Sequence, residues 1–363
     1  MVADYPPTMI DTKLFLTAAA ALLTAACTAP GAPSETAASE AALWRFTEAA
    51  PQLQAASCPE DQPFTRAEGF DITVEPLALG EADVVSLAGG YTLSGWVLAS
   101  ASDRFGGLSG MAVMASGTVL AVSDKGAFIW LTMEDGAPTG AAHYAKMQDE
   151  AGEPLGGKTR GDAEGLALAD GVALVSFERD HRILAFDLEA CGANALGVPV
   201  ARVASRPAGL SRTMRENGGI EGLTLLADDT LAAVIETRDP SVPYGRLRDD
   251  GSLTVEAQIP TFEGKSGTGI EAVGDTLYTV HRDYRPGDGN HVTLSATPLL
   301  DGVPAGEPKP LLSLDPSGQS DNFEAVAAVL NAEGAVSRLY LLSDDNFSDR
   351  QRTLLFALDV NSP

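Results

Sequence analysis

Acidic side chains recur along this chain at the start of short apolar runs. Five copies of a short pattern are present, and each has a polar residue followed by Gly or Ala and then by an apolar segment. The copies begin at Ser109, Glu164, Glu221, Glu271 and Glu324, so four of the five begin with glutamate. Carboxylate oxygens suit Ca²⁺, whereas zinc sites usually contain Cys or His. A bound cation can polarise an ester and lower the pKa of a water molecule. If the fold gathers these acids, they predict metal-assisted hydrolysis.

The spacing of the copies predicts the fold that would gather them. Successive copies begin 55, 57, 50 and 53 positions apart. Within a copy, two apolar runs flank a turn such as Asp170-Gly171, which is the pattern of a β-hairpin. A period near fifty with strand-like runs is typical of a β-propeller with one four-stranded sheet per blade. We therefore predict an all-β propeller of four-stranded antiparallel sheets.

The number of blades is less closely defined than the fold. Five copies carry the repeated pattern, and residues 64–105 form a further strand-rich stretch without it. Together with the last strand, LLFALDV, this stretch could complete a sixth blade, because propellers close by pairing the two ends of the chain. We expect six blades, with five as the alternative.

Hairpin geometry predicts which side chains meet. The two arms of a hairpin bring residues equidistant from the turn to one end of the sheet, so Glu164 should lie beside Glu178. Ser109 should likewise lie beside Asp124. If the first strand of each hairpin is innermost, these groups crowd the mouth of a central channel. The expected metal ligands are Glu164, Glu221, Glu271, Glu324 and Asp344.

Basic side chains are predicted at the same mouth. A ring of carboxylates repels itself unless positive charge offsets it, and Lys125, Arg179 and Arg282 stand near hairpin ends. Guanidinium groups match the oxygens of phosphate or carboxylate, so we expect a small anionic substrate. Alternatively, each Glu accepts N–H bonds from the neighbouring blade and locks the ring. The protein would then be a non-catalytic envelope propeller that binds a ligand or partner.

Other motifs favour metal-assisted water attack over a covalent route. His281 ends a hairpin beside Arg282 and is the best placed of four histidines for acid–base work, alongside Glu164 and Glu221. No Ser-His-Asp set can be assembled with it. The P-loop-like run GEPLGGKT at 152–159 lacks the preceding strand and following helix of a phosphate site. We predict a flexible rim loop there.

The N-terminal residues predict export. Leu14–Ala26 is a short apolar segment after Lys13, and it ends in small residues before Cys27, as in a signal peptide with a lipobox. We expect lipid attachment at Cys27, with simple cleavage near Ala26 as the alternative. A flexible tether over 28–60 would then lead to a propeller domain over 61–363. The protein is accordingly expected in a bacterial periplasm or anchored to the outer membrane.

Composition and cysteine content narrow the partners. The chain carries 24 Lys and Arg against 50 Asp and Glu, a net charge of −26, which argues against nucleic acid or an anionic membrane surface. Membrane contact is expected only through the lipid, and we expect a monomer. If Cys27 is acylated, Cys58 and Cys191 could form a disulfide outside the cytoplasm. Two unpaired cysteines are the alternative.

Several longer runs resemble a known family. FGGLSGMAV, GDAEGLALADGVALVSFERDHRI, GGIEGLTLLADDTLAAVIE and RLYLLSDDNFSDRQRTLLFALDV are similar to the bacterial phytase-like domain family, which is described as having esterase-like activity. The resemblance covers roughly residues 64–360. It implies a β-propeller and an ester or phosphoester hydrolase, with calcium by analogy to propeller phytases. The Glu-Gly pattern also resembles calcium-dependent propeller lactonases of the gluconolactonase type, a second alternative.

Overall fold

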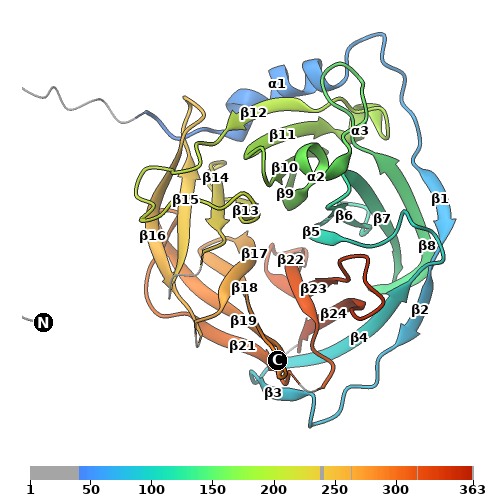
Figure 1. The fold of residues 1–363 in the computed structure, drawn as a ribbon, viewed down its shortest axis with the longest axis vertical. Coiled ribbons are helices and arrows are strands. Elements are labelled where there is room, and N and C mark those ends of the chain that lie inside the picture. The colour runs from blue at the N-terminus through green and yellow to red at the C-terminus, as the bar shows by residue number, and fades with distance from the viewer. Residues whose placement is uncertain (1–40, 238–240, 263, 317, 362–363) are drawn as a thin grey trace, which may run out of the picture. The chain divides into compact units, whose positions relative to one another are not determined.

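Five antiparallel sheets surround a central axis in the computed structural model, like the blades of a propeller (Figure 1). The structure describes residues 41–361 except 238–240, 263 and 317. The prediction of an all-β propeller is confirmed, and the number of blades is five rather than six. No helix within the described residues combines the length and apolarity needed to cross a membrane.

The first three blades are built mainly from consecutive strands, with the innermost strand first in each. Blade 1 consists of β5 (Leu108–Val113), β6 (Val119–Ser123), β7 (Ala127–Glu134), β8 (Ala137–Lys146) and β1 (Glu68–Asp71). Blade 2 consists of β9 (Ala163–Ala169), β10 (Val172–Phe177), β11 (Arg182–Asp187) and β12 (Val198–Arg202). Blade 3 consists of β13 (Ile220–Leu225), β14 (Leu231–Ile235), β15 (Ser241–Leu247) and β16 (Leu253–Pro260).

The last two blades take outer strands from the N-terminal part of the chain. Blade 4 consists of β17 (Ser266–Val273), β18 (Thr276–Arg285), β19 (Gly289–Leu300), β21 (Lys309–Leu314) and β3 (Val84–Leu87), and β20 (Val303–Pro304) also pairs with β19. Blade 5 consists of β22 (Asn322–Leu330), β23 (Val336–Asp344), β24 (Thr353–Val360), β4 (Tyr91–Ala99) and β2 (Thr73–Pro76).

The expected sixth blade is absent because residues 64–105 supply outer strands instead. These strands join the outer edges of three different blades. β1 joins blade 1, β3 joins blade 4, and β2 and β4 join blade 5. An innermost strand is covered on both faces, and most residues of β1, β2 and β3 are too exposed for that role. β24 pairs with β4 along its whole length, from Thr353 to Val360. The two ends of the chain therefore do meet, as predicted, but within blade 5.

Glycines allow the innermost strands to pack closely around the axis. β5, β9, β13, β17 and β22 each contact the next around the ring. A Cβ atom added at Gly110 would lie 2.3 Å from the carbonyl oxygen of Glu164, and one at Gly269 would lie 2.3 Å from that of Glu324. Such a contact requires the backbones to move apart. Glycine is therefore required at these two positions for the blades to pack as closely as they do.

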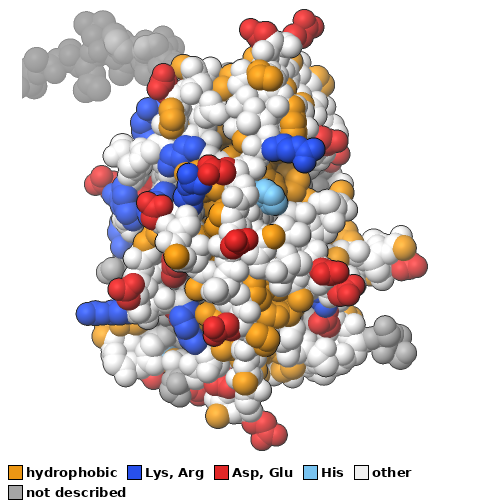
Figure 2. Space-filling model, turned by 90° about the vertical axis from the view of Figure 1, so that its right-hand side faces the viewer, with side chains coloured by type: hydrophobic (Ala, Val, Ile, Leu, Met, Phe, Trp, Pro, Cys, Tyr) orange, Lys and Arg blue, Asp and Glu red, His pale blue; other side chains and the backbone are white. Residues whose placement is uncertain are grey.

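Apolar side chains fill the spaces between blades. β10 and β14 are buried along their whole length, which fits strands covered on both faces. Leu174 and Ile183 of blade 2 pack with Leu223 and Ile235 of blade 3 in one cluster. Figure 2 looks onto the outer surface over β1 and β8, where Lys and Arg gather toward the left and acids are scattered. The acidic charge on that face therefore forms no single patch.

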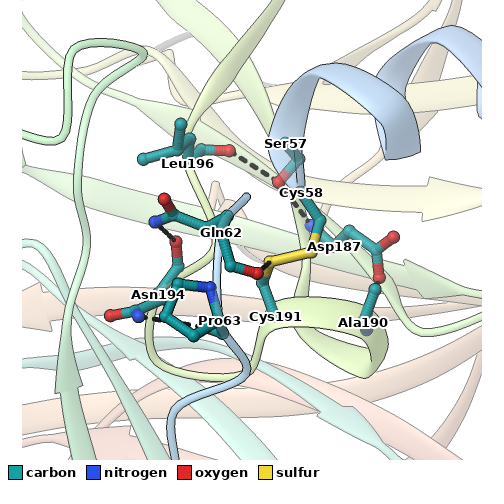
Figure 3. Close-up of a disulfide and its surroundings, with 9 residues drawn as sticks. All are labelled: Ser57, Cys58, Gln62, Pro63, Asp187, Ala190, Cys191, Asn194 and Leu196. Atoms are coloured by element: carbon teal, nitrogen blue, oxygen red, sulfur yellow. Dashed lines mark hydrogen bonds between the residues drawn. A yellow bond between two sulfur atoms is a disulfide. The ribbon is translucent and has the colours of Figure 1, made fainter. Parts of the chain in front are cut away.

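A helix and a disulfide attach the N-terminal segment to blade 2. Helix α1 (Phe46–Ser57) contacts β11 and β12, and Phe46 is 2% exposed. Cys58 is bonded to Cys191 at the end of α3 (Leu188–Cys191), with 5.6 Å between their Cα atoms (Figure 3). The predicted disulfide is therefore present. Residues 41–60 are packed rather than part of the expected tether, and Cys27 lies outside the described residues.

Candidate functional site

A β-bulge at the start of each innermost strand sets apart the repeated polar residue. In blade 3 the pairing of β13 with β14 shifts between Ile220 and Gly222, which leaves Glu221 as the extra residue. A bulge re-aims the side chain it carries. The equivalent positions in the five blades are Ser109, Glu164, Glu221, Thr268 and Glu324. Four of them line one cavity of about 210 Å³, and Thr268 does not.

Blade 4 departs from the predicted alignment by three residues. Its bulge falls at Thr268, before Gly269, whereas the sequence pattern selected Glu271. Glu271 does not line the cavity. Its carboxyl group accepts a hydrogen bond from the backbone of Ala328, and burial raises its pKa to about 8. The apolar residues that follow Glu271 imitate the repeated pattern, but the close strand contact at Gly269 fixes the true register.

A second set of side chains enters the cavity from the second strand of every blade. These positions are level with the bulges, and they are Asp124, Glu178, Glu236, Arg282 and Asp344. Further along the channel, the space narrows to about 10 Å³ between Leu166, Leu223 and other inner-strand residues. That volume admits about one water molecule. Only a narrow space therefore continues from the cavity along the axis, and the lining of the cavity is strongly acidic.

On one side of the pocket, three carboxylates converge. One carboxylate oxygen from each of Asp162, Glu164 and Glu178 lies within 4.8 Å of the other two. Burial, followed by repulsion from Glu221 and other acids, raises the pKa of Glu164 well above its usual range. Burial and Asp162 likewise raise the pKa of Glu178 to about 7. The Glu178 carboxyl group also interacts with that of Glu221, which opposes the rise in the pKa of Glu178. We call these four residues the acidic side.

On the opposite side, an arginine offsets the acid. Arg282 Nη2 donates to Glu324 Oε1 at 3.2 Å, and Asn322 Nδ2 donates to the same oxygen at 2.8 Å. Burial raises the pKa of Glu324, and the Arg282 charge opposes that shift. We call Arg282, Asn322 and Glu324 the arginine side. Asp344 pairs with Asn322 on the same blade, and burial followed by repulsion from Glu324 raises its pKa well above its usual range.

The basic residues predicted at the mouth have different positions. Arg282 lines the pocket, whereas Lys125 and Arg179 do not. Arg179 lies just outside it, where Nε donates to Asp162 Oδ2 at 2.7 Å and Nη2 donates to Asn217 Oδ1 at 2.6 Å. The Lys125 ammonium group lies 3.1 Å from the centre of the Phe347 ring. Of the three predicted substrate-binding residues, only Arg282 lines the pocket, whereas Arg179 contacts the acidic side from outside through Asp162.

His281 is buried inside blade 4, away from the pocket. Its side chain has no exposed surface, and Nε2 lies 2.9 Å from Ser295 Oγ. Burial lowers the pKa of His281 to about 3. The predicted position at the rim is wrong because successive side chains of a strand point to opposite faces, so Arg282 reaches the pocket while His281 is buried within the propeller. A neutral, enclosed imidazole has no access to a molecule in the pocket.

The alternative that the glutamates lock the blades together fails for Glu164 and Glu324. Glu221 accepts one bond from the backbone N–H of Gly219, whereas Glu324 is held by side chains. Within the described residues no hydrogen bond to the Glu164 carboxylate is present. The blades are instead joined by hydroxyl groups, as where Ser176 Oγ donates to the carbonyl of Ile220 at 2.8 Å. Thr268 Oγ1 similarly donates to the carbonyl of Phe323 at 3.0 Å.

The donor set of the pocket fits a hard cation. The ligand atoms on the acidic side are all oxygens, which suits Ca²⁺ better than zinc. On the adjoining blade 1, Asp124 Oδ1 is buried and has no hydrogen-bond partner among the described residues. Lys158 Nζ lies 3.6 Å from the other oxygen of Asp124. The predicted ligands Glu164, Glu221, Glu324 and Asp344 all line the pocket. A calcium ion would replace the protons that these crowded acids otherwise retain.

Sequence reasoning missed several residues of the pocket. Asp162 precedes the bulge of blade 2 in the run GDAEG, where proximity to Glu164 could have indicated it. Asn217 comes from a loop, and only tertiary structure brings it to the mouth. Lys158 belongs to the P-loop-like run, whose end forms the short helix α2 (Gly157–Gly161). Lys158 lines the pocket, so the end of that run lies at the rim as expected, but it is helical rather than a loop.

Comparison with known proteins relates the chain to one family. The family described as "Phytase-like: Esterase-like activity of phytase" matches residues 103–347. No curated protein matches the chain.

Solved structures with similar folds include three enzymes. PQQ-bound aldose sugar dehydrogenase from Streptomyces coelicolor is 14% identical, with 76% of this chain and 100% of that chain covered and a TM-score of 0.44. Endo-arabinase from Bacteroides thetaiotaomicron is 12% identical, with 72% and 96% covered and a TM-score of 0.44. The calcium structure of a Trichoderma reesei family AA12 enzyme is 12% identical, with 84% and 100% covered and a TM-score of 0.41.

Proposed function

The chain belongs to the phytase-like family, and we propose that it hydrolyses an ester or phosphoester of a small anionic substrate in the acidic pocket, with calcium. The observation that carries this proposal is the convergence of Asp162, Glu164 and Glu178, whose oxygens lie within 4.8 Å of one another. Buried carboxylates at this spacing repel each other unless a proton or cation is held between them. The protein would use that requirement to hold calcium beside the substrate.

The residues of the pocket have complementary roles in this proposal. Asp162, Glu164 and Glu178 would hold calcium on the acidic side, with Glu221, Glu324 and Asp344 bordering it. Calcium, when bound, supplies polarisation of the ester oxygen and a lowered pKa for water. Arg282 donates charge-assisted hydrogen bonds to the anionic group of the substrate.

Proton transfer falls to Glu221, which lines the pocket beside the proposed calcium ligands. A general base must lie within hydrogen-bond reach of the water that it deprotonates, and Glu221 is not itself one of those ligands. Its carboxylate would accept the proton of the attacking water. His281 has no part in this scheme because it is enclosed in blade 4.

Thermal unfolding in EDTA and after addition of Ca²⁺ tests the metal site directly. A ligand that binds only the folded state raises the unfolding midpoint with concentration. Glu164→Gln should abolish this response, whereas Glu271→Gln, which changes a buried acid outside the pocket, should retain it. Hydrolysis of aryl phosphates, aryl esters and lactones would then be measured on the same variants. No stabilisation at millimolar Ca²⁺ would contradict the metal-dependent reaction.

We further propose that the protein is exported, lipid-anchored through Cys27 and monomeric. Support comes from the apolar segment before Cys27 and from the disulfide between Cys58 and Cys191, a bond rare in reducing cytosol. Labelling of cells with a fatty-acid probe should mark the wild-type protein and not Cys27→Ser. Equal labelling of both would overturn the anchor.

A further inference from the structure

A second cavity adjoins the acidic pocket on the side of blades 3 and 4. Its volume is about 500 Å³, and it shares Asn217, Glu236 and Arg282 with the pocket. Its other lining residues include Arg215 and Tyr284. We call it the side cavity. A molecule whose reacting group lies among the acids could therefore extend into it past Arg282.

The hairpin of blade 4 places an exposed aromatic ring beside this space. β18 and β19 remain paired as far as Arg285 and Gly289, so β18 continues beyond the level of the bulge. Tyr284 follows Arg282 by two positions, and side chains two apart lie on the same side of a strand. The Tyr284 side chain is 61% exposed. Blade 2 has no counterpart, because β10 ends at Phe177, just before its cavity residue Glu178.

The cations of the side cavity retain donors for a ligand. Arg282 Nε is buried and has no hydrogen-bond partner among the described residues, although Nη2 of the same side chain bonds Glu324. Arg215 Nη2 lies 3.2 Å from Glu236 Oε2, and about half of the Arg215 side chain is exposed to solvent. Guanidinium groups recognise planar or tetrahedral oxyanions, and aromatic rings stack on tyrosine.

From this arrangement we infer that the substrate carries a ring next to its anionic group, with the ring on Tyr284 in the side cavity and Arg215 at its far end. The inference rests on the proposed function, because it assigns the reacting group to the acidic pocket. It adds a substrate class, ring-bearing anionic esters, and makes Tyr284 and Arg215 specificity-determining residues.

Binding of two non-hydrolysable probes tests the ring separately from the chemistry. Phenylphosphonate and methylphosphonate would be titrated calorimetrically into the calcium-supplemented protein. A stacked ring contributes about a tenfold gain in affinity, so phenylphosphonate should bind about tenfold more tightly. Tyr284→Ala should remove this ratio without weakening methylphosphonate. Leu300→Ala, which truncates another exposed apolar residue of the same hairpin, should leave the ratio unchanged.

Arg215→Gln tests the outer end of the side cavity. With 4-carboxyphenylphosphonate, whose second anion lies beyond the ring, the variant should bind about fivefold more weakly than wild type. Its affinity for methylphosphonate should not change.

The outcomes separate the two proposals. Equal affinity for phenyl and methyl probes, absence of binding by both, or a ratio that survives Tyr284→Ala would overturn the ring inference. Ring-dependent binding without hydrolysis of any ester would instead contradict the proposed reaction while supporting the side cavity. Hydrolysis without ring preference would support the reaction and overturn the inference.

Discussion

The two sides of the pocket meet the same electrostatic problem in different ways. On the arginine side, Glu324 is compensated within the chain by Arg282 and Asn322. On the acidic side, Glu164 and Glu178 face further acids, and the nearby Arg179 bonds Asp162 rather than either of them. A carboxylate whose charge is neutralised by an arginine of the same chain requires no further ion. A carboxylate surrounded by other acids must bind a proton or a cation from solution. The acidic side is therefore where we propose cation binding, and the arginine side is where we propose anion binding.

The strongest way to break this comparison is to neutralise the acidic side. Glu164→Gln should lower kcat/KM for the best ester substrate by about 10²- to 10³-fold, because metal-derived stabilisation of the transition state amounts to several kcal/mol. Steady-state kinetics at saturating Ca²⁺ would measure the loss. Glu271→Gln should differ from wild type by less than about twofold. Equal losses in both variants would mean that general disruption, not the pocket, controls activity.

The pH dependence of stability sharpens the same contrast. The folded-state pKa of Glu178, about 7, exceeds its unfolded value near 4.5, so the folded protein binds the additional proton. Without calcium, stability should therefore decrease as pH rises from about 4.5 to about 7, by up to about 3 kcal/mol from this group. Urea unfolding in EDTA at several pH values would measure it. Glu178→Gln should flatten the slope, and an unchanged slope would contradict the assignment.

On the arginine side, Arg282→Gln should raise KM for an anionic ester about tenfold with a smaller change in kcat, because a charge-assisted contact is lost. The substitution also leaves Glu324 without its cation. The double variant Arg282→Gln, Glu324→Gln should therefore recover stability without recovering KM. If the double variant restores KM as well, Arg282 acts only by compensating Glu324.

The smallest expected effect concerns the exposed cation at the rim. Lys158 Nζ lies 3.6 Å from Asp124 and is 67% exposed, so its pairing with that acid is weak. Lys158→Gln should tighten calcium binding by about twofold, because a competing positive charge is removed, and calorimetry at low ionic strength would detect it. Weaker binding in this variant would contradict a cation site near Asp124.

The sequence predicted the fold more completely than the pocket. Glu164, Glu221 and Glu324 could be placed at one end of a ring because strand periodicity and turn residues are local signals. Glu271 was misplaced because local pattern cannot reveal a contact such as that between Gly269 and the neighbouring strand. His281 was misplaced because the pattern did not reveal which of two successive residues, His281 or Arg282, faces the pocket. Asn217 reaches the pocket from a loop and Lys158 from the short helix α2, and neither segment carries a periodic signal.

The blade count failed for a related reason. Strands between residues 68 and 99 have strand-like composition, but nothing local specifies which sheet edge each one joins. They join blades 1, 4 and 5 because the other strands of those blades leave an unpaired outer edge there. The blade that an outer strand joins can therefore be predicted only when the arrangement of the other strands is known.

These outer strands also affect how the molecule folds. β3 pairs with β21 and β4 pairs with β24, although the partners are separated by more than half of the chain. Contacts of such high contact order form slowly, because distant segments must find each other before the pairing gains stability. Blades 4 and 5 cannot be completed until the C-terminal strands emerge, so a chain still being synthesised would expose unpaired edges. Blade 5 therefore has to wait for β24 before β4 gains the partner that closes the ring of blades.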